Sequence, residues 1–123
     1  MEFNLKLNIG GVDMSENLSF GSNLDLLCKT IEQRKNSDEE KKSYTRQLLN
    51  RGVDHIAQKV GEESTELVIS SANKDKDSVI YESADLIYHM IVLWRSLEIS
   101  PTEIGDELNK RQGISGIEEK ESR

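Results

Sequence analysis

Apolar residues return every three or four positions along most of the chain, which is the period of an amphipathic helix. The pattern predicts helices over residues 22–33, 44–51, 53–72, 78–97 and 101–111. The segments 53–72 and 78–97 are the longest, and only a short polar turn separates them. The predicted fold class is therefore all-α, an antiparallel helical bundle centred on one long helix hairpin and completed by dimerisation.

Residues with known capping preferences mark the ends of these segments. Ser22 precedes the first apolar stripe in the Ser-x-x-acid form of a helix start. Gly52 closes the short helix 44–51, because glycine adopts the backbone conformation that commonly follows a helix. Ser100 and Pro101 combine a cap residue with proline at the first helical position, which predicts a further helix start.

The two ends of the chain differ from its helical middle. Apolar and polar residues alternate in the first segment, with apolar residues at Phe3, Leu5, Leu7 and Ile9. This alternation is typical of a short strand, and a flexible leader is an equally good interpretation at a terminus. We expect a leader over residues 1–21, an all-α domain over 22–111 and a flexible acidic tail over 112–123.

Composition and charge narrow the possible functions. The 23 acidic residues outnumber the 16 basic ones, and the net charge of −7 argues against a sequence-independent nucleic-acid binder. The single cysteine, Cys28, cannot form an intrachain disulfide and is typical of a reducing compartment. No apolar run is long enough to cross a membrane, and no signal peptide is recognisable. We expect a cytoplasmic protein that binds neither nucleic acid nor membrane.

The hydrophobic core expected for this chain is thin. Aromatic residues make up 5% of the sequence, and a domain of this length buries only about two thirds of its unfolded surface. Association of two copies would cover further apolar surface, so a homodimer is expected.

Two pairs of acidic residues carry the strongest chemical signal. Glu63 and Glu66 lie three residues apart on one predicted helix, and Glu82 and Asp85 do so on the next. Residues at this spacing share a helix face. If the two helices fold back on each other about Lys74, Glu66 faces Glu82 and Glu63 faces Asp85.

These four acids interrupt apolar stripes, which places them beside the core. In the same register Lys59 lies level with His89. Four like charges in a partly dry place repel one another, and a bound cation removes that repulsion. Carboxylate oxygens without cysteine or paired histidine ligands suit Mg²⁺ or Mn²⁺ better than zinc. The alternative is a solvated acidic face on two surface helices.

Two motifs and an upstream tripeptide resemble a known enzyme family. The motifs are KVGEESTELV over residues 59–68 and ESADLIYH over 82–89, and the tripeptide is Ser43-Tyr44-Thr45. They resemble phosphoribosyl-ATP pyrophosphohydrolase, a family of the all-α nucleoside-triphosphate pyrophosphatases. The resemblance implies a helical, Mg²⁺-dependent dimer that converts phosphoribosyl-ATP and water to phosphoribosyl-AMP and pyrophosphate, the second step of histidine biosynthesis.

The resemblance also implies roles for single residues. The implied metal ligands are Glu63, Glu66, Glu82 and Asp85. The implied catalytic residues are Glu62 and Glu63, with Glu62 as the candidate base for the attacking water. The implied substrate contacts are Ser43, Tyr44, Lys59, His89 and Arg111. Three of these have structural alternatives: Lys59 neutralises the acids, His89 is a hydrogen-bonded core residue, and Arg111 caps a helix.

Two other functions stay open at this point. A housekeeping pyrophosphatase of the same superfamily, acting on dUTP, dCTP or noncanonical nucleotides, would share the acidic cluster, although the Ser43-Tyr44-Thr45 tripeptide disfavours it. A non-catalytic helical interaction module would carry the acids as surface decoration, and Mg²⁺ would not stabilise it. The chain departs from the family pattern in its long leader and in its charged connection over residues 36–42.

Overall fold

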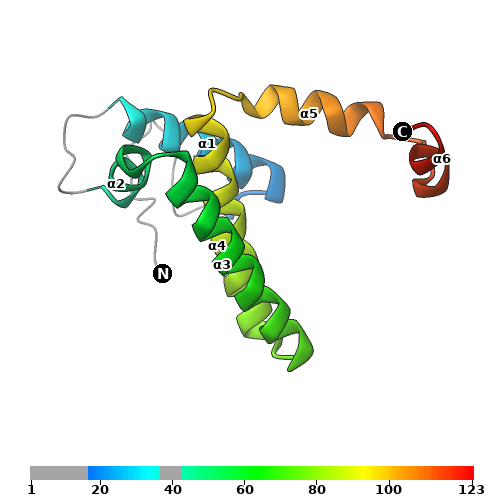
Figure 1. Ribbon diagram of the computed structural model, residues 1–123, viewed down its shortest axis with the longest axis horizontal. Helices are drawn as coiled ribbons and strands as arrows, with labels where there is room; N and C mark the ends of the chain where they lie inside the picture. The colour runs from blue at the N-terminus through cyan, green and yellow to red at the C-terminus, as the bar shows by residue number, and fades with distance from the viewer. Residues whose placement is uncertain (1–16, 37–42) are drawn as a thin grey trace.

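The part of the chain that the computed structural model describes, residues 17–36 and 43–123, forms helices and no strand (Figure 1). The all-α prediction is therefore confirmed. The helices are α1 (Phe20–Lys35), α2 (Tyr44–Arg51), α3 (Val53–Ala72), α4 (Lys76–Ser96), α5 (Pro101–Lys110) and α6 (Gly116–Glu121). Among these described helices, none is both long enough and apolar enough to cross a lipid bilayer.

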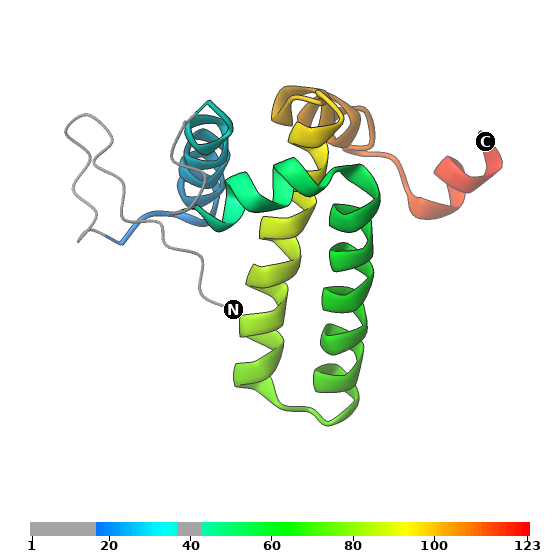
Figure 2. The same ribbon diagram turned by 60° about the vertical axis from the view of Figure 1, so that its left-hand side comes forward.

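Helices α3 and α4 make the most extensive contact in the molecule and run antiparallel, side by side (Figure 2). The turn between them holds Lys74 in the left-handed conformation, with φ at 55°. Asp75 caps α4, and its carboxylate accepts hydrogen bonds from the Ser78 backbone N–H at 3.2 Å and the Ser78 hydroxyl at 2.7 Å. The turn is thus centred on Lys74, the residue from which the sequence analysis predicted that Glu66 faces Glu82.

The hydrophobic core lies where α1 and α2 pack against one end of the α3–α4 pair (Figure 2). Its buried cluster consists of Leu27, Ile31, Leu48, Ile56, Tyr88, Ile91 and Val92. Burying one aliphatic side chain of this size stabilises the fold by about 1.5–3 kcal/mol. An ion pair between Arg95 Nε and Glu32 Oε2, 2.6 Å apart, also ties α4 to α1. The core therefore supports the half of α4 that follows the acidic residues.

Helix α5 extends away from the α3–α4 pair (Figure 1). It begins as the sequence predicts: Ser100 Oγ accepts a hydrogen bond from the Glu103 N–H at 3.3 Å, and Glu103 Oε2 accepts one from the Ser100 N–H at 2.8 Å. No residue of α5 is buried, and Leu108 is 58% exposed. Helix α5 thus leaves apolar surface uncovered in the single chain.

Two helix starts lie earlier than the sequence predicts. Helix α1 begins at Phe20, because Ser19 Oγ accepts a hydrogen bond from the Ser22 N–H at 3.1 Å and acts as the cap. Ser22, the predicted cap, therefore lies in the first turn. Helix α4 begins at Lys76 and not at Ser78, because Asp75 supplies its cap.

The ends of the chain differ in how far the structure describes them. The sequence predicts a flexible tail over residues 112–123, whereas this segment contains α6. Ser115 Oγ accepts a hydrogen bond from the Glu118 N–H at 3.1 Å, which stabilises the start of that short helix. The predicted strand over residues 3–9 lies outside the described residues, as does most of the charged connection over 36–42.

Candidate active site

Three carboxylates meet between α3 and α4. Glu63 and Glu66 lie one turn apart on α3, and Glu82 reaches them from α4. One oxygen of each of the three lies within 4.8 Å of the others. We call these three residues the acidic cluster. The spacing of Glu63 and Glu66 puts both on one helix face, and the antiparallel neighbour supplies the third group at matching height.

The acidic cluster is partly dry. Glu63 is only 4% exposed, and burial together with the charges of Glu66 and Asp85 raises its pKa to about 7. Burial and the neighbouring Glu66 also raise the pKa of Glu82. Oε2 of Glu63 and Oε2 of Glu82 are buried and have no hydrogen-bond partner in the described part of the chain. Oxygen atoms in this condition are suited to bind a cation.

Asp85 lies one turn beyond Glu82 on α4, beside the cluster. It is 3% exposed, and its charge contributes to the raised pKa of Glu63. Its carboxylate is not among the oxygens that meet within 4.8 Å. The structure therefore brings three of the four predicted metal ligands into direct proximity and the fourth next to them.

Lys59 and Glu62 border the acidic cluster on the α3 side. Lys59 Nζ lies 3.1 Å from Glu62 Oε2 and 3.9 Å from Glu63 Oε1. Gln58 Nε2 donates a second hydrogen bond to Glu62, at 3.2 Å. The Lys59 ammonium and the Gln58 amide lower the pKa of the exposed Glu62 carboxyl. Glu62 therefore stays ionised at the rim, while Lys59 neutralises part of the acidic charge.

Tyr44 and His89 lie together next to Asp85. The backbone carbonyl of Asp85 can only accept, so His89 Nδ1, 2.8 Å away, donates to it. The other nitrogen, Nε2, then accepts from the Tyr44 hydroxyl at 3.4 Å. His89 is fully buried, and this burial lowers its pKa, which favours the neutral ring. Tyr44 belongs to α2, so the site draws on three helices.

Ser43 and Arg111 occupy structural positions in the single chain. Ser43 is buried and caps α2, since its Oγ accepts a hydrogen bond from the Arg46 N–H at 3.2 Å. Arg111 follows α5, where its Nη2 lies 3.0 Å from Glu107 Oε1. Arg111 caps the end of α5, and this helix extends away from the α3–α4 pair (Figure 1).

Thr45 and Tyr88 lie within the Ser43-Tyr44-Thr45 and ESADLIYH motifs, but the sequence analysis predicted no individual role for either residue. Both are buried, and their hydroxyls form a hydrogen bond that joins α2 to α4. The available signal was Tyr88 itself, a hydroxyl-bearing residue inside the apolar run of α4 and directly before His89. A buried hydroxyl requires a partner, and the sequence alone does not identify which residue supplies it.

Comparison with known proteins shows which family this chain resembles. The family model of phosphoribosyl-ATP pyrophosphohydrolase matches residues 24–112. The chain is 44% identical over 110 residues to a phosphoribosyl-ATP pyrophosphatase of Azospirillum brasilense, covering 89% of this chain and 98% of that protein. It is 46% identical over 100 residues to one of Geotalea daltonii, covering 81% and 93%.

A third relative is longer than this chain. The phosphoribosyl-ATP pyrophosphatase of Granulibacter bethesdensis is 45% identical over 100 residues, which cover 81% of this chain and 62% of that protein. The match thus spans less than two thirds of that relative. All three matches cover at least 81% of this chain, and the family model covers well over half of it. The chain therefore belongs to the phosphoribosyl-ATP pyrophosphohydrolase family.

Proposed function

We propose that this chain hydrolyses phosphoribosyl-ATP to phosphoribosyl-AMP and pyrophosphate, the second step of histidine biosynthesis. The observation that carries the proposal is the acidic cluster, with three carboxylate oxygens within 4.8 Å of one another. Carboxylates repel phosphate oxygens, so such a cluster serves a triphosphate substrate only with a cation between them. The family match over residues 24–112 supports phosphoribosyl-ATP as the substrate.

The cation proposed is Mg²⁺, with Mn²⁺ as a substitute. Glu63, Glu66 and Glu82 would hold it, with Asp85 as a further ligand. The fit rests on the donor set, which is all hard oxygen, and on the two buried oxygens that have no hydrogen-bond partner among the described residues. When bound, the cation would neutralise phosphate oxygens and stabilise the departing pyrophosphate.

The chain's own side chains would position substrate and move one proton. Glu62 is the proposed acceptor of the proton from the attacking water, because its carboxylate lies exposed at the rim of the acidic cluster, beside Lys59. Glu63, whose buried carboxylate lies 3.9 Å from Lys59 Nζ, is the second proposed catalytic residue. Lys59, 3.1 Å from Glu62, would also pair with a substrate phosphate.

The remaining proposed substrate contacts differ in how directly the structure supports them. Tyr44 and His89 lie next to Asp85; the Tyr44 hydroxyl has lone pairs to offer, whereas both ring nitrogens of the fully buried His89 are already hydrogen-bonded. Ser43 caps α2 and would act by fixing the Tyr44 backbone. Arg111 would reach a substrate only if the association of two copies brought α5 to the site.

Product analysis tests the proposed reaction. Phosphoribosyl-ATP is compared with dUTP, dCTP and ATP, each in Mg²⁺, in Mn²⁺ and in EDTA. We expect phosphoribosyl-AMP and pyrophosphate from phosphoribosyl-ATP, and no turnover in EDTA. A higher kcat/KM for dUTP or dCTP than for phosphoribosyl-ATP would show that the preferred substrate is that nucleotide. Release of inorganic phosphate in place of pyrophosphate would contradict the proposed reaction itself.

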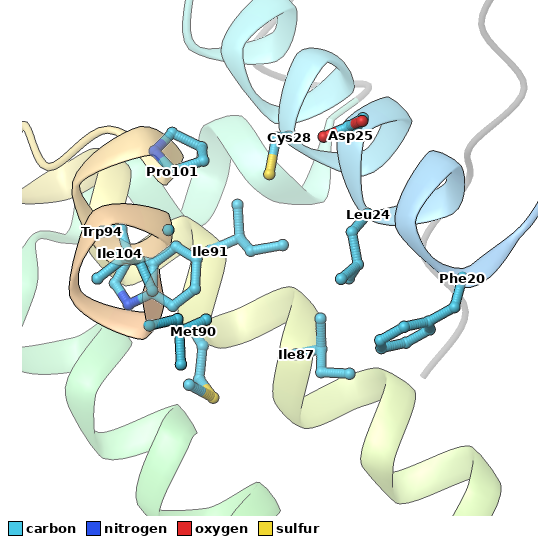
Figure 3. A pocket seen from close by; sticks show the side chains of 12 residues that line it. Phe20, Leu24, Asp25, Cys28, Ile87, Met90, Ile91, Trp94, Pro101 and Ile104 are labelled. Atoms are coloured by element: carbon cyan, nitrogen blue, oxygen red, sulfur yellow. The ribbon is translucent and has the colours of Figure 1, made fainter. Parts of the chain in front are cut away.

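We further propose that the functional unit is a homodimer. An apolar groove of about 330 Å³ lies between α1, α4 and α5, and Figure 3 shows Leu24, Ile87 and Met90 at its wall. Phe20 and Leu108 at its edges are 72% and 58% exposed. A second copy of the chain is the proposed occupant, because the core of this small chain is thin and the groove continues along the apolar side of α4.

A further inference from the structure

Helix α2 carries Tyr44 to the site, yet it is too short to hold its position alone. It has 8 residues, fewer than an isolated helix needs to be stable in water. Contacts with other helices must therefore fix it. Two of its side chains are buried: Leu48 joins the hydrophobic core, and Thr45 reaches α4.

The partner of Thr45 on α4 is Tyr88. Their hydroxyls form a hydrogen bond, and the two residues are 7% and 2% exposed. Burial raises the pKa of Tyr88 to about 12, so its hydroxyl keeps its proton at neutral pH. Separating the pair would break a hydrogen bond between two buried residues, which is unfavourable. The hydrogen bond therefore fixes the spacing between α2 and α4 at this point.

The ring of Tyr88 also contacts both side chains that are proposed to meet the substrate. Its centroid lies 6.2 Å from that of Tyr44, with the rings stacked at 22°. It lies 5.2 Å from the His89 centroid, edge to face at 83°. One buried side chain thus bonds to α2 through its hydroxyl and packs against Tyr44 and His89 through its ring.

This packing determines which polar atoms Tyr44 and His89 can offer. His89 Nδ1 donates a hydrogen bond to the Asp85 carbonyl, so His89 Nε2 accepts a hydrogen bond from the Tyr44 hydroxyl. The Tyr44 oxygen keeps lone pairs for a donor on water or substrate. It is close enough to the charges of Lys59 and Glu63 for both to shift its pKa. A displacement of α2 would separate Tyr44 from His89 and remove this arrangement.

We propose that the Thr45–Tyr88 hydroxyl pair is a positioning device that holds α2 so that the Tyr44 hydroxyl meets His89 beside the acidic cluster. Thr45 and Tyr88 act through Tyr44 and His89, so they are positioning residues. The inference rests on the proposed function for its effect on turnover. The geometry that it describes can be measured without any substrate.

Thr45→Val and Tyr88→Phe test the pair by kinetics, at a temperature where circular dichroism shows each variant to be folded. We expect each to lower kcat/KM for phosphoribosyl-ATP about tenfold, mainly through KM, because a hydrogen bond of ordinary strength no longer fixes α2. Thr45→Ser keeps the hydroxyl and is expected to retain wild-type kinetics. Thr102→Val, at an exposed threonine of α5, is the matched control.

The double variant Thr45→Val/Tyr88→Phe separates positioning from stability. Replacing both partners with apolar groups removes both hydroxyls of this hydrogen bond, so we expect its melting temperature to recover relative to the single variants. Its kcat/KM is expected to stay low, because α2 is still unfixed. Recovery of kcat/KM together with melting temperature would overturn the inference, as would wild-type kcat/KM in Thr45→Val.

The ¹⁵N chemical shift of His89 Nε2 supplies a readout without turnover, since it reports whether that nitrogen accepts a hydrogen bond. We expect it to move in Thr45→Val and to match the wild type in Thr45→Ser. If the two variants show this pattern but the wild type does not turn over phosphoribosyl-ATP, the proposed function fails and the positioning role stands. An unchanged His89 signal in Thr45→Val would overturn the positioning role whatever the substrate is.

Discussion

Glu63 is the residue at which burial and charge conflict most directly. Its position in the middle of α3 is set by the helix, and Glu82 and Asp85 approach from α4. The pKa of Glu63 is raised to about 7, which means that ionisation of this carboxyl destabilises the metal-free protein. A bound cation would remove this penalty, so binding and stability are linked at one side chain.

The first prediction removes single charges from this group. Glu66→Gln and Asp85→Asn are expected to lower kcat/KM for phosphoribosyl-ATP by at least about a hundredfold, because several kcal/mol of charge stabilisation depend on the intact ligand set. Neither variant should unfold, since each relieves repulsion with Glu63. Glu121→Gln in α6 is the control for loss of an exposed carboxylate. Wild-type turnover in both site variants at low Mg²⁺ would exclude these acids from the site.

The second prediction concerns the pH dependence of stability in EDTA. The Glu63 pKa is raised from 4.5 to about 7 in the folded state, so between these values the folded chain binds a proton that the unfolded chain has released. Stability conferred in this way is present at low pH and falls as pH rises through that window. Thermal unfolding should show a lower Tm at about pH 8 than at about pH 5. Glu63→Gln, which cannot ionise, should flatten this part of the profile, and an unchanged slope would contradict the assignment.

At the scale of helices, the acidic cluster could be predicted because, in a helix hairpin, the number of residues from the turn gives a residue's position along the helix axis. Once Lys74 is taken as the turn, Glu66 and Glu82 must lie level. The Thr45–Tyr88 contact joins helices that are not consecutive, and no register relates their numbers. The sequence did not determine whether Ser19 or Ser22 caps α1, since serine is a preferred capping residue at either position.

The third prediction tests the register of the α3–α4 pair. One alanine inserted after Ile69, between the two acids and the turn, rotates Glu63 and Glu66 together by about 100° relative to α4, so both leave the face that meets Glu82. We expect this variant to lose Mg²⁺-dependent release of pyrophosphate. One alanine inserted after Lys74 lies in the turn, which can absorb it, and partial activity should remain. Equal activity of the two variants would show that the register does not matter for the site.

At the scale of the whole molecule, the direction of α5 escaped prediction. Glu98 adopts φ of 59°, in the left-handed region that non-glycine residues seldom occupy. Glu98 turns the chain after α4, and a glutamate side chain gives no indication of a left-handed backbone conformation. The position of Arg111 depends on that turn, which explains why a residue expected at the substrate lies apart from the acidic cluster in the single chain.

The fourth prediction is the assembly state. If the groove between α1, α4 and α5 receives a second copy, the chain should sediment at twice 14.0 kDa at micromolar concentration. Leu108→Lys adds a charge at an exposed edge of the groove and should shift the protein towards the monomer without unfolding it. Ile117→Lys, at a 73% exposed position of α6, is the control. A 14.0 kDa species alone in the wild type would exclude the dimer.

The α3–α4 hairpin has a consequence for how the protein folds. Its contacts join residues that are close in sequence, and such contacts form early because little chain has to be closed into a loop. We therefore expect Glu63, Glu66 and Glu82 to meet before α1, which is distant along the chain, packs against α4. Repulsion that is already present in the transition state slows folding more than it speeds unfolding. We therefore expect the charges proposed for pyrophosphate release also to slow folding to the native state.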